Sequence, residues 1–128
     1  MAEHTHIRSD FVPGHWQFVT DGGKSLTIDR ESSPYDYLFG ALSGCLFATF
    51  SDLAVKMKVG WEHVSFEVDG EKRTESPTTL EWVTVKVVAT GVDNQGKFTK
   101  AFETATRYCS IYETLSKVAR MEWTVSFN

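Results

Sequence analysis

The chain has 128 residues, a length typical of one domain that buries about two-thirds of the surface its unfolded form exposes. Hydrophobic residues make up 41% and charged residues 23% of the sequence, as in ordinary soluble globular proteins. The net charge is −4 and no basic run exceeds Lys72-Arg73, which argues against a nucleic-acid partner because phosphate binding needs a concentrated basic surface.

The first ten residues predict neither a secretion signal nor a membrane span. Residues 1–10 are polar, and no segment of the chain approaches about 18 uninterrupted apolar residues. We therefore expect a cytoplasmic protein with no membrane partner, one domain over residues 1–128, and a mobile tail at residues 1–10. His4-Thr5-His6 falls in this tail, and two cysteines are too few for a zinc site without histidine, so we predict no metal and no cofactor.

Hydrophobic periodicity predicts an alternation of strands and helices. Because hairpins and sequence-adjacent strands favour antiparallel pairing, we expect an α+β fold with antiparallel sheets. The predicted elements are, in chain order, strands at 16–20 and 25–29 around the turn Asp21-Gly22-Gly23-Lys24, a helix at 33–58, strands at 61–69 and 80–90, helices at 98–107 and 110–119, and a strand at 121–127.

The helix predicted at 33–58 is the most apolar segment of the chain. Ser33 can cap it, Pro34 suits its first position, and Asp36 places a carboxylate three residues after the cap. From Leu38 on, apolar and small residues cover nearly the whole circumference, a pattern typical of a helix buried on several sides. Small residues four apart, at Gly40 and Gly44, allow close approach of another helix. An intertwined homodimer is therefore favoured over a monomer.

Cys45 and Cys109 are the two cysteines of the chain. Cys45 lies deep in the apolar helix, where desolvation would raise the pKa of its thiol, and it can equally be a small packed hydrophobe. Cys109 precedes Ser110-Ile111-Tyr112-Glu113, a capping-box pattern. The amide groups of the following helix, with Arg107 nearby, would lower the pKa of Cys109, although a purely packed residue is the alternative. Two interpretations of Cys45 and Cys109 stay open: they form a thiol redox couple, or they are two unrelated buried thiols.

Short motifs around both cysteines resemble those of the OsmC/Ohr family of small thiol-dependent peroxidases. The resemblance implies an intertwined α+β homodimer with a long buried central helix and active sites at the subunit interface. With the predicted hairpin it covers nearly the whole chain. The motifs are Ser33-Pro34-Tyr35-Asp36-Tyr37-Leu38, Ala41-Leu42-Ser43-Gly44-Cys45, Arg107-Tyr108-Cys109-Ser110 and Thr114-Leu115.

The same resemblance implies a function and site residues. Cys45 would be the peroxidatic thiolate that reduces organic hydroperoxides or hydrogen peroxide, and Cys109 would be the resolving thiol. A small thiol or dithiol would then reduce the disulfide. The alternative is a non-catalytic dimer of the same fold that binds a small apolar or thiol-reactive ligand at the subunit interface.

Two positions depart from the family pattern. Where the organic-hydroperoxide branch has a glutamate directly after the helix-start proline, this chain has Tyr35, with the acid one residue later at Asp36. Where that branch has an arginine before the first hairpin, this chain has Gly14 or His15. We expect His15 and Asp36 to complete the catalytic set, with plain loop and helix-start roles as the alternatives. Arg8 and Arg30 are further candidates for the missing cation.

Overall fold

The computed structural model describes residues 3–128, which form two compact units. One unit comprises the residues up to Phe39, and the other runs from Gly40 to Asn128. Helix α1 (Pro34–Met57) starts in the first unit and continues into the second. The prediction of one domain over residues 1–128 stays a prediction, and residues 1–2 of the predicted tail lie outside the described residues.

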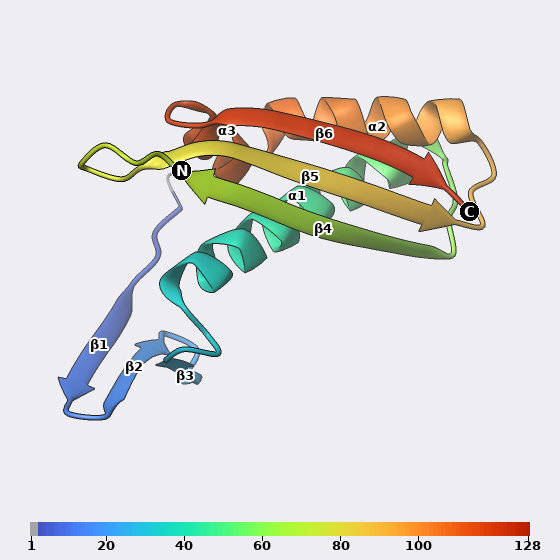
Figure 1. Cartoon of the computed structure of the whole chain (residues 1–128). Helices are drawn as coiled ribbons and strands as arrows, with labels where there is room; N and C mark the ends of the chain where they lie inside the picture. The colour runs from blue at the N-terminus through green and yellow to red at the C-terminus, as the bar shows by residue number, and fades with distance from the viewer. Residues whose placement is uncertain (1–2) are drawn as a thin grey trace. The chain divides into compact units, whose positions relative to one another are not determined.

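The first unit is a three-stranded antiparallel sheet (Figure 1). Its strands are β1 (Ile7–Val12), β2 (His15–Thr20) and β3 (Ser25–Ile28), in the order β1-β2-β3. The β1–β2 turn contains Gly14 at φ 81° and the β2–β3 turn contains Gly23 at φ 88°, a conformation that glycine adopts without the steric cost borne by other residues.

Strand β1 corrects the prediction of a mobile tail at residues 1–10. Residues 7–10 belong to β1 and pair with β2, and His6 Nδ1 lies 3.0 Å from Asp21 Oδ1. No alternation of apolar and polar side chains marks this strand in the sequence, because every residue of β1 is exposed.

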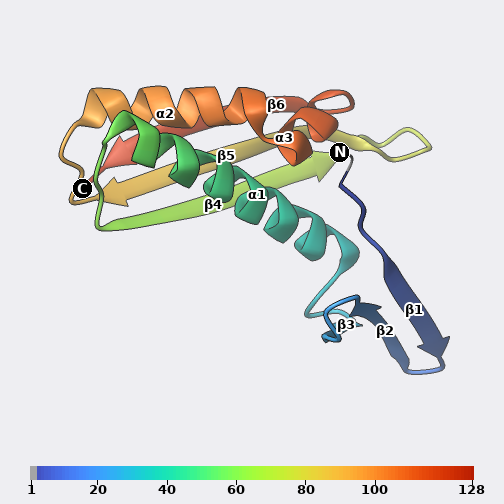
Figure 2. The ribbon, with the colours of Figure 1, turned by 180° about the vertical axis from the view of Figure 1, so that it is seen from behind.

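The second unit is a three-stranded sheet covered on one face by helices. Its strands are β4 (His63–Lys72), β5 (Leu80–Thr90) and β6 (Arg120–Phe127), in the order β4-β5-β6. Helices α2 (Gln95–Tyr108) and α3 (Ser110–Ser116) connect β5 to β6. Figures 1 and 2 show, from opposite sides, that α2, α3 and the part of α1 after Phe39 lie on the same face of this sheet.

Strand pairing agrees with the predicted antiparallel sheets except at the last strand. The β4–β5 pair is antiparallel, as are both pairs of the first unit. Strand β6 instead runs parallel to β5. Two helices between β5 and β6 carry the chain back to the edge where β5 begins, so β6 can only run in the same direction.

Aromatic side chains form the core between this sheet and its helices. Phe50 of α1 packs against Phe98 of α2 with ring centroids 4.6 Å apart, and both side chains are fully buried. Phe102 of α2 lies against Phe66 of β4 at 5.7 Å and Trp123 of β6 at 5.2 Å. These contacts join α1 to α2 and α2 to the sheet, so they set how the two helices lie on it.

Helix α1 buries one stripe within the chain rather than its whole circumference. The fully buried positions are four apart, at Leu42, Leu46, Phe50 and Ala54. The opposite face, including Ala41, Gly44 and Ala48, is exposed. Of the helices in the described part, only α1 has the length and apolar composition to cross a membrane, a test that core helices of soluble proteins also pass.

We predict that Phe102→Ala lowers the free energy of unfolding by about 3–5 kcal/mol, because it leaves a cavity between α2 and both β4 and β6. Urea denaturation followed by circular dichroism measures this change. Lys100→Ala, an exposed position of the same helix, is the control and should change the unfolding free energy by less than about 0.5 kcal/mol. Equal effects of the two substitutions would contradict this description of the core.

Candidate functional site

Cys45 and Cys109 lie side by side, with their Sγ atoms 3.2 Å apart. Cys45 comes from the middle of α1 and is half-buried, whereas Cys109 comes from the junction of α2 and α3 and is fully buried. Both thiols are free. Since a disulfide bond is about 2.05 Å long, closing this pair requires the sulfurs to approach by only about 1 Å.

The junction between α2 and α3 holds Cys109 in place from both sides. Its backbone N–H donates to Ala105 O at 2.8 Å, which ends α2, and its Sγ accepts from the Tyr112 N–H at 3.5 Å, which begins α3. Cys109 is therefore the residue that caps α3. The expectation that Ser110 is the cap is wrong by one position, because the sulfur takes the role assigned to the hydroxyl.

Cys45 receives several hydrogen bonds from the start of α3. Burial raises the pKa of Cys45, but hydrogen bonds from the Ile111 N–H and the Cys109 thiol, with weaker ones from Ser110, outweigh it. The pKa of Cys45 therefore lies below the ordinary value of a thiol. The Ser110 Oγ atom lies 3.9 Å from Cys45 Sγ. None of these interactions comes from a cationic side chain of the described residues.

Cys109 has the opposite shift, which corrects the prediction that the start of α3 and Arg107 lower its pKa. Burial, together with the neighbouring Cys45 sulfur, raises the pKa of Cys109 to about 11, despite the hydrogen bond from Tyr112. Arg107 does not approach the thiol, because its Nη2 pairs with Glu103 Oε1 at 2.9 Å on the exposed side of α2.

The opposite shifts set the order in which the two sulfurs lose their protons as the pH rises. Cys45 is the sulfur that ionises more readily, and Cys109 stays a thiol that donates to it. A thiolate is the nucleophilic form of cysteine. Because the Cys45 side chain is partly exposed, a small molecule can reach its sulfur. The arrangement suits a reaction in which Cys45 attacks first and Cys109 closes a disulfide afterwards.

Asp36 and His15, the other predicted site residues, both lie in the unit that ends at Phe39. Asp36 Oδ2 accepts from the Ser33 N–H at 2.9 Å, and the Asp36 N–H donates to Ser33 Oγ at 3.2 Å. This reciprocal pair is the capping box of α1, and it lowers the pKa of Asp36. His15, at the exposed start of β2, has its Nε2 atom 3.1 Å from Gln17 Oε1. Their catalytic roles stay predictions.

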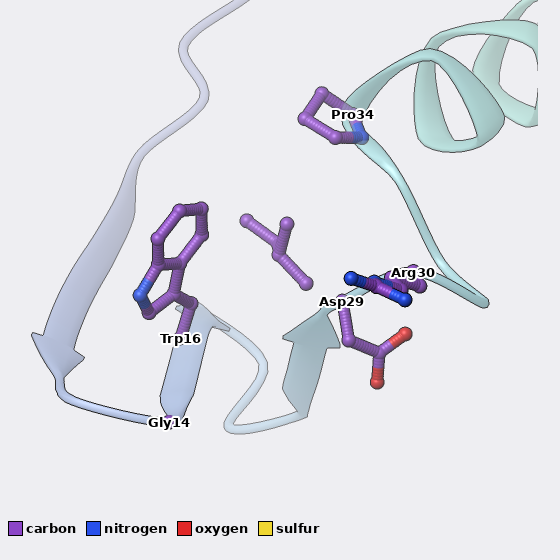
Figure 3. Close-up of a pocket in the computed structure, with 6 residues that line it drawn as sticks. Gly14, Trp16, Asp29, Arg30 and Pro34 are labelled. Atoms are coloured by element: carbon purple, nitrogen blue, oxygen red, sulfur yellow. The ribbon is translucent and has the colours of Figure 1, made fainter.

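The two arginines considered as replacement cations lie in the same unit. Arg8 Nη2 is 3.1 Å from Asp10 Oδ2 along β1. Arg30 lines a cavity between β3 and the start of α1 (Figure 3). Tyr35, at the position where the organic-hydroperoxide branch has a glutamate, packs edge-on against Phe39 with ring centroids 6.2 Å apart.

Sequence reasoning missed the contribution of Ser110, Ile111 and Tyr112 to the thiol pair. The capping pattern marked this segment as the start of a helix, but the contact with Cys45 spans 65 residues and depends on tertiary packing. The site has no metal-ligand set. No group of three or more histidine, cysteine or acidic residues within residues 3–128 could hold a metal ion.

This chain is similar to known proteins both by sequence profile and by structure. The sequence profile described as OsmC-like protein matches residues 27–124. No curated protein sequence is similar enough to match the chain. Among solved structures, an OsmC-like protein from Mycoplasma pneumoniae superimposes with a TM-score of 0.88 at 15% identity, covering 99% of each chain.

Two further similar structures are those of proteins named for organic hydroperoxide resistance. One is the organic hydroperoxide resistance protein OsmC from Legionella pneumophila, with a TM-score of 0.75, 15% identity, and 98% of each chain covered. The other is the organic hydroperoxide resistance protein OhrB of Bacillus subtilis, with a TM-score of 0.69, 11% identity, and coverage of 97% of this chain and 98% of the other. At these identities the likeness concerns the fold alone.

We predict that Ser110→Ala raises the pKa of Cys45, because it removes the hydroxyl beside the Cys45 sulfur. The rate of alkylation by iodoacetamide follows the thiolate fraction, so its midpoint should move to higher pH and the rate at pH 7 should fall several-fold. Mass mapping of the alkylated peptides separates Cys45 from Cys109.

Ser116→Ala is the matched control, since Ser116 lies at the other end of α3 and its hydroxyl donates to Glu113 O. Its alkylation profile should equal that of the unsubstituted protein. Faster labelling of Cys109 than of Cys45 at pH 7 would contradict the assignment of the lower pKa to Cys45.

Proposed function

Since this chain belongs to the OsmC-like protein family, we propose that it reduces peroxides through Cys45 and Cys109. The observation that carries the proposal is the Sγ–Sγ distance of 3.2 Å between a sulfur with a lowered pKa and one with a raised pKa. The hydroperoxide resistance named for the Legionella and Bacillus proteins supports organic hydroperoxides as the substrates, with hydrogen peroxide as the smaller alternative.

In the first step the Cys45 thiolate attacks one oxygen of the peroxide. The S–O bond forms as the O–O bond breaks, and the departing alkoxide takes up a proton and leaves as an alcohol. Cys45 becomes a sulfenic acid and the peroxide is reduced by two electrons. The hydrogen bonds from Ile111 and Cys109 favour the thiolate form of Cys45, which is the form that begins this reaction.

In the second step Cys109 attacks the Cys45 sulfenic sulfur. The S–S bond forms, the S–O bond breaks, and the hydroxide leaves as water with the proton from Cys109. The raised pKa of Cys109 delays its own ionisation until this step. A thiol or dithiol from solution then reduces the disulfide and returns both sulfurs to the starting state. Because Cys45 is the more exposed sulfur, it is the accessible point of attack.

We further propose that the protein is a homodimer. The exposed face of α1 carries Ala41, Gly44 and Ala48, whose small side chains permit close approach of a second helix. Helix α1 is apolar, and its own chain leaves one face of it uncovered. Burying that face against another protein surface is energetically favourable. A second copy would also complete the burial that the sequence predicts for α1.

We predict that Cys45→Ser abolishes peroxide consumption. In the Cys109→Ser variant the reaction should stop after the first step, with Cys45 as a sulfenic acid. Cys45→Ser removes the nucleophile, whereas Cys109→Ser removes only the resolving thiol and keeps a side chain that can cap α3. Turnover is measured with cumene hydroperoxide and a dithiol. In the Cys109→Ser variant, mass spectrometry should detect one added oxygen atom on Cys45, and treatment with a thiol should remove that oxygen.

Thr49→Ser serves as the control for both variants. The Thr49 hydroxyl donates to the Cys45 carbonyl within α1, serine can make the same bond, and turnover should stay unchanged. Undiminished peroxide consumption by Cys45→Ser would refute the proposal. Slow oxidation of Cys45 by excess peroxide in the unsubstituted protein would favour the non-catalytic ligand-binding alternative instead.

We predict a solution mass of twice the 14.4 kDa chain mass by light scattering. Ala48→Glu places a charge on the small-residue face of α1 and should shift the mass to that of one chain. Lys97→Glu, exposed on α2, should not. A monomeric unsubstituted protein would contradict the dimer proposal while leaving the thiol chemistry open to its own test.

A further inference from the structure

Ser110 places a hydroxyl group beside the Cys45 sulfur that takes no part in forming helix α3. The Cys109 sulfur caps this helix, so the Ser110 hydroxyl is not its cap. The backbone of Ser110 has the structural contact, since its carbonyl accepts from the Thr114 hydroxyl at 2.8 Å. Within residues 3–128 the hydrogen-bond contact of Ser110 Oγ is with Cys45 Sγ, 3.9 Å away.

The Cys45 sulfur has two donors that act on it more strongly than the Ser110 hydroxyl does. The Cys109 thiol lies 3.2 Å away, and the Ile111 N–H also donates to this sulfur. The contact with Ser110 is longer, and a serine hydroxyl can rotate to direct its proton elsewhere. Ser110 can therefore donate to an incoming oxygen atom while the other two donors stay on the sulfur.

The Ser110 hydroxyl lies at a distance from the Cys45 sulfur that a peroxide oxygen can bridge. Reacting atoms lie about 3–3.5 Å apart just before a bond forms. A hydroxyl donates to another oxygen at about 2.7–2.8 Å. Together these lengths exceed the 3.9 Å between Ser110 Oγ and Cys45 Sγ, so one oxygen can make both contacts at once. The second oxygen of a peroxide is only one bond away and comes within reach of the same hydroxyl.

Burial separates the two neighbours of Cys45 into an inner and an outer group. Cys109 is fully buried and contacts Cys45 from the core, whereas Ser110 is exposed in the single chain. A peroxide therefore meets Cys45 on the side of Ser110. A partner chain that covered this side would enclose the reactants and keep the contact between Ser110 and Cys45, because both residues belong to the same unit of one chain.

We infer that Ser110 is a further catalytic residue, whose hydroxyl donates a hydrogen bond to the departing oxygen of the peroxide. This role rests on the proposed peroxide reduction. As the S–O bond to Cys45 forms and the O–O bond breaks, the electron pair of the broken bond passes to the departing oxygen. Ser110 stabilises the charge that develops there and keeps its own proton, and water supplies the proton of the alcohol. A donor directed at charge that develops in the transition state raises the rate of the chemical step.

The test compares the unsubstituted protein with Ser110→Ala in single-turnover oxidation of Cys45 by cumene hydroperoxide, measured across pH. On the plateau above the pKa of Cys45 the thiol is fully ionised in both proteins, so a change in that pKa no longer contributes. Ser110→Ala should lower this plateau about tenfold, the effect of losing one hydrogen bond in the transition state. The plateau for alkylation by iodoacetamide should not fall, because a thiolate of higher pKa is intrinsically more nucleophilic.

Three further measurements separate this role from a disturbed site. Ser110→Thr keeps a hydroxyl and should retain the peroxide plateau. Ser116→Ala, the control on the same helix, should leave the peroxide and alkylation plateaus unchanged, since its hydroxyl donates to Glu113 O. Peracetic acid releases acetate, a weak base that needs little stabilisation, so Ser110→Ala should slow this reaction less than that of cumene hydroperoxide.

The outcomes distinguish the role of Ser110 from the proposed function. Equal plateaus of Ser110→Ala and the unsubstituted protein with cumene hydroperoxide would overturn the role of Ser110 and leave peroxide reduction standing. An equal loss with peracetic acid, or an equal fall in the alkylation plateau, would overturn it in the same way. If Cys45 of the unsubstituted protein reacts with cumene hydroperoxide no faster than free cysteine does, the proposed function fails and the role of Ser110 fails with it.

Discussion

The packing of Phe50 against Phe98 is the contact on which the arrangement of the thiols depends. Phe50 lies five residues after Cys45 on α1, and Phe98 lies on α2, whose far end leads into Cys109. Both rings are fully buried, and Phe102 ties the same helix to Trp123 of the sheet. Because protein interiors are close-packed, the helices cannot slide along each other without opening a cavity. The 3.2 Å separation of two sulfurs from distant segments is thus set by the hydrophobic core.

The two thiols differ in pKa without any nearby cation in the unit that contains them. Backbone and side-chain donors at the start of α3 lower the pKa of Cys45, whereas burial raises that of Cys109 to about 11. Organic-hydroperoxide relatives are expected to use an arginine and a glutamate for this purpose, and neither stands at the corresponding position of this sequence. Hydrogen bonding alone supplies part of the same effect, since any donor directed at a thiolate favours the charged form over the neutral one.

Local sequence signals predicted the elements well and the tertiary electrostatics poorly. The long helix expected at 33–58 is Pro34–Met57, because its cap, its first-position proline and its apolar periodicity all agree. Strand β1 escaped prediction because its side chains are exposed, and the parallel pairing of β6 followed from the path of two helices rather than from any strand pattern. The order of the thiol pKa values was reversed because Cys45 draws its donors from α3, and Cys109 was judged by its neighbours in sequence instead of by its burial.

Cys109 occupies a position where sulfur is a poor choice for stability. It ends one helix with its amide and begins the next with its side chain, a place where serine, threonine, aspartate or asparagine would make a stronger cap. A 3.5 Å contact from Tyr112 N to a weakly accepting sulfur stabilises α3 less than an oxygen would. The start of α3 is therefore less stable than it would be with an oxygen cap, but the cap residue places a thiol next to Cys45. Position 109 is a site of local frustration, where the demands of folding and of chemistry select different side chains.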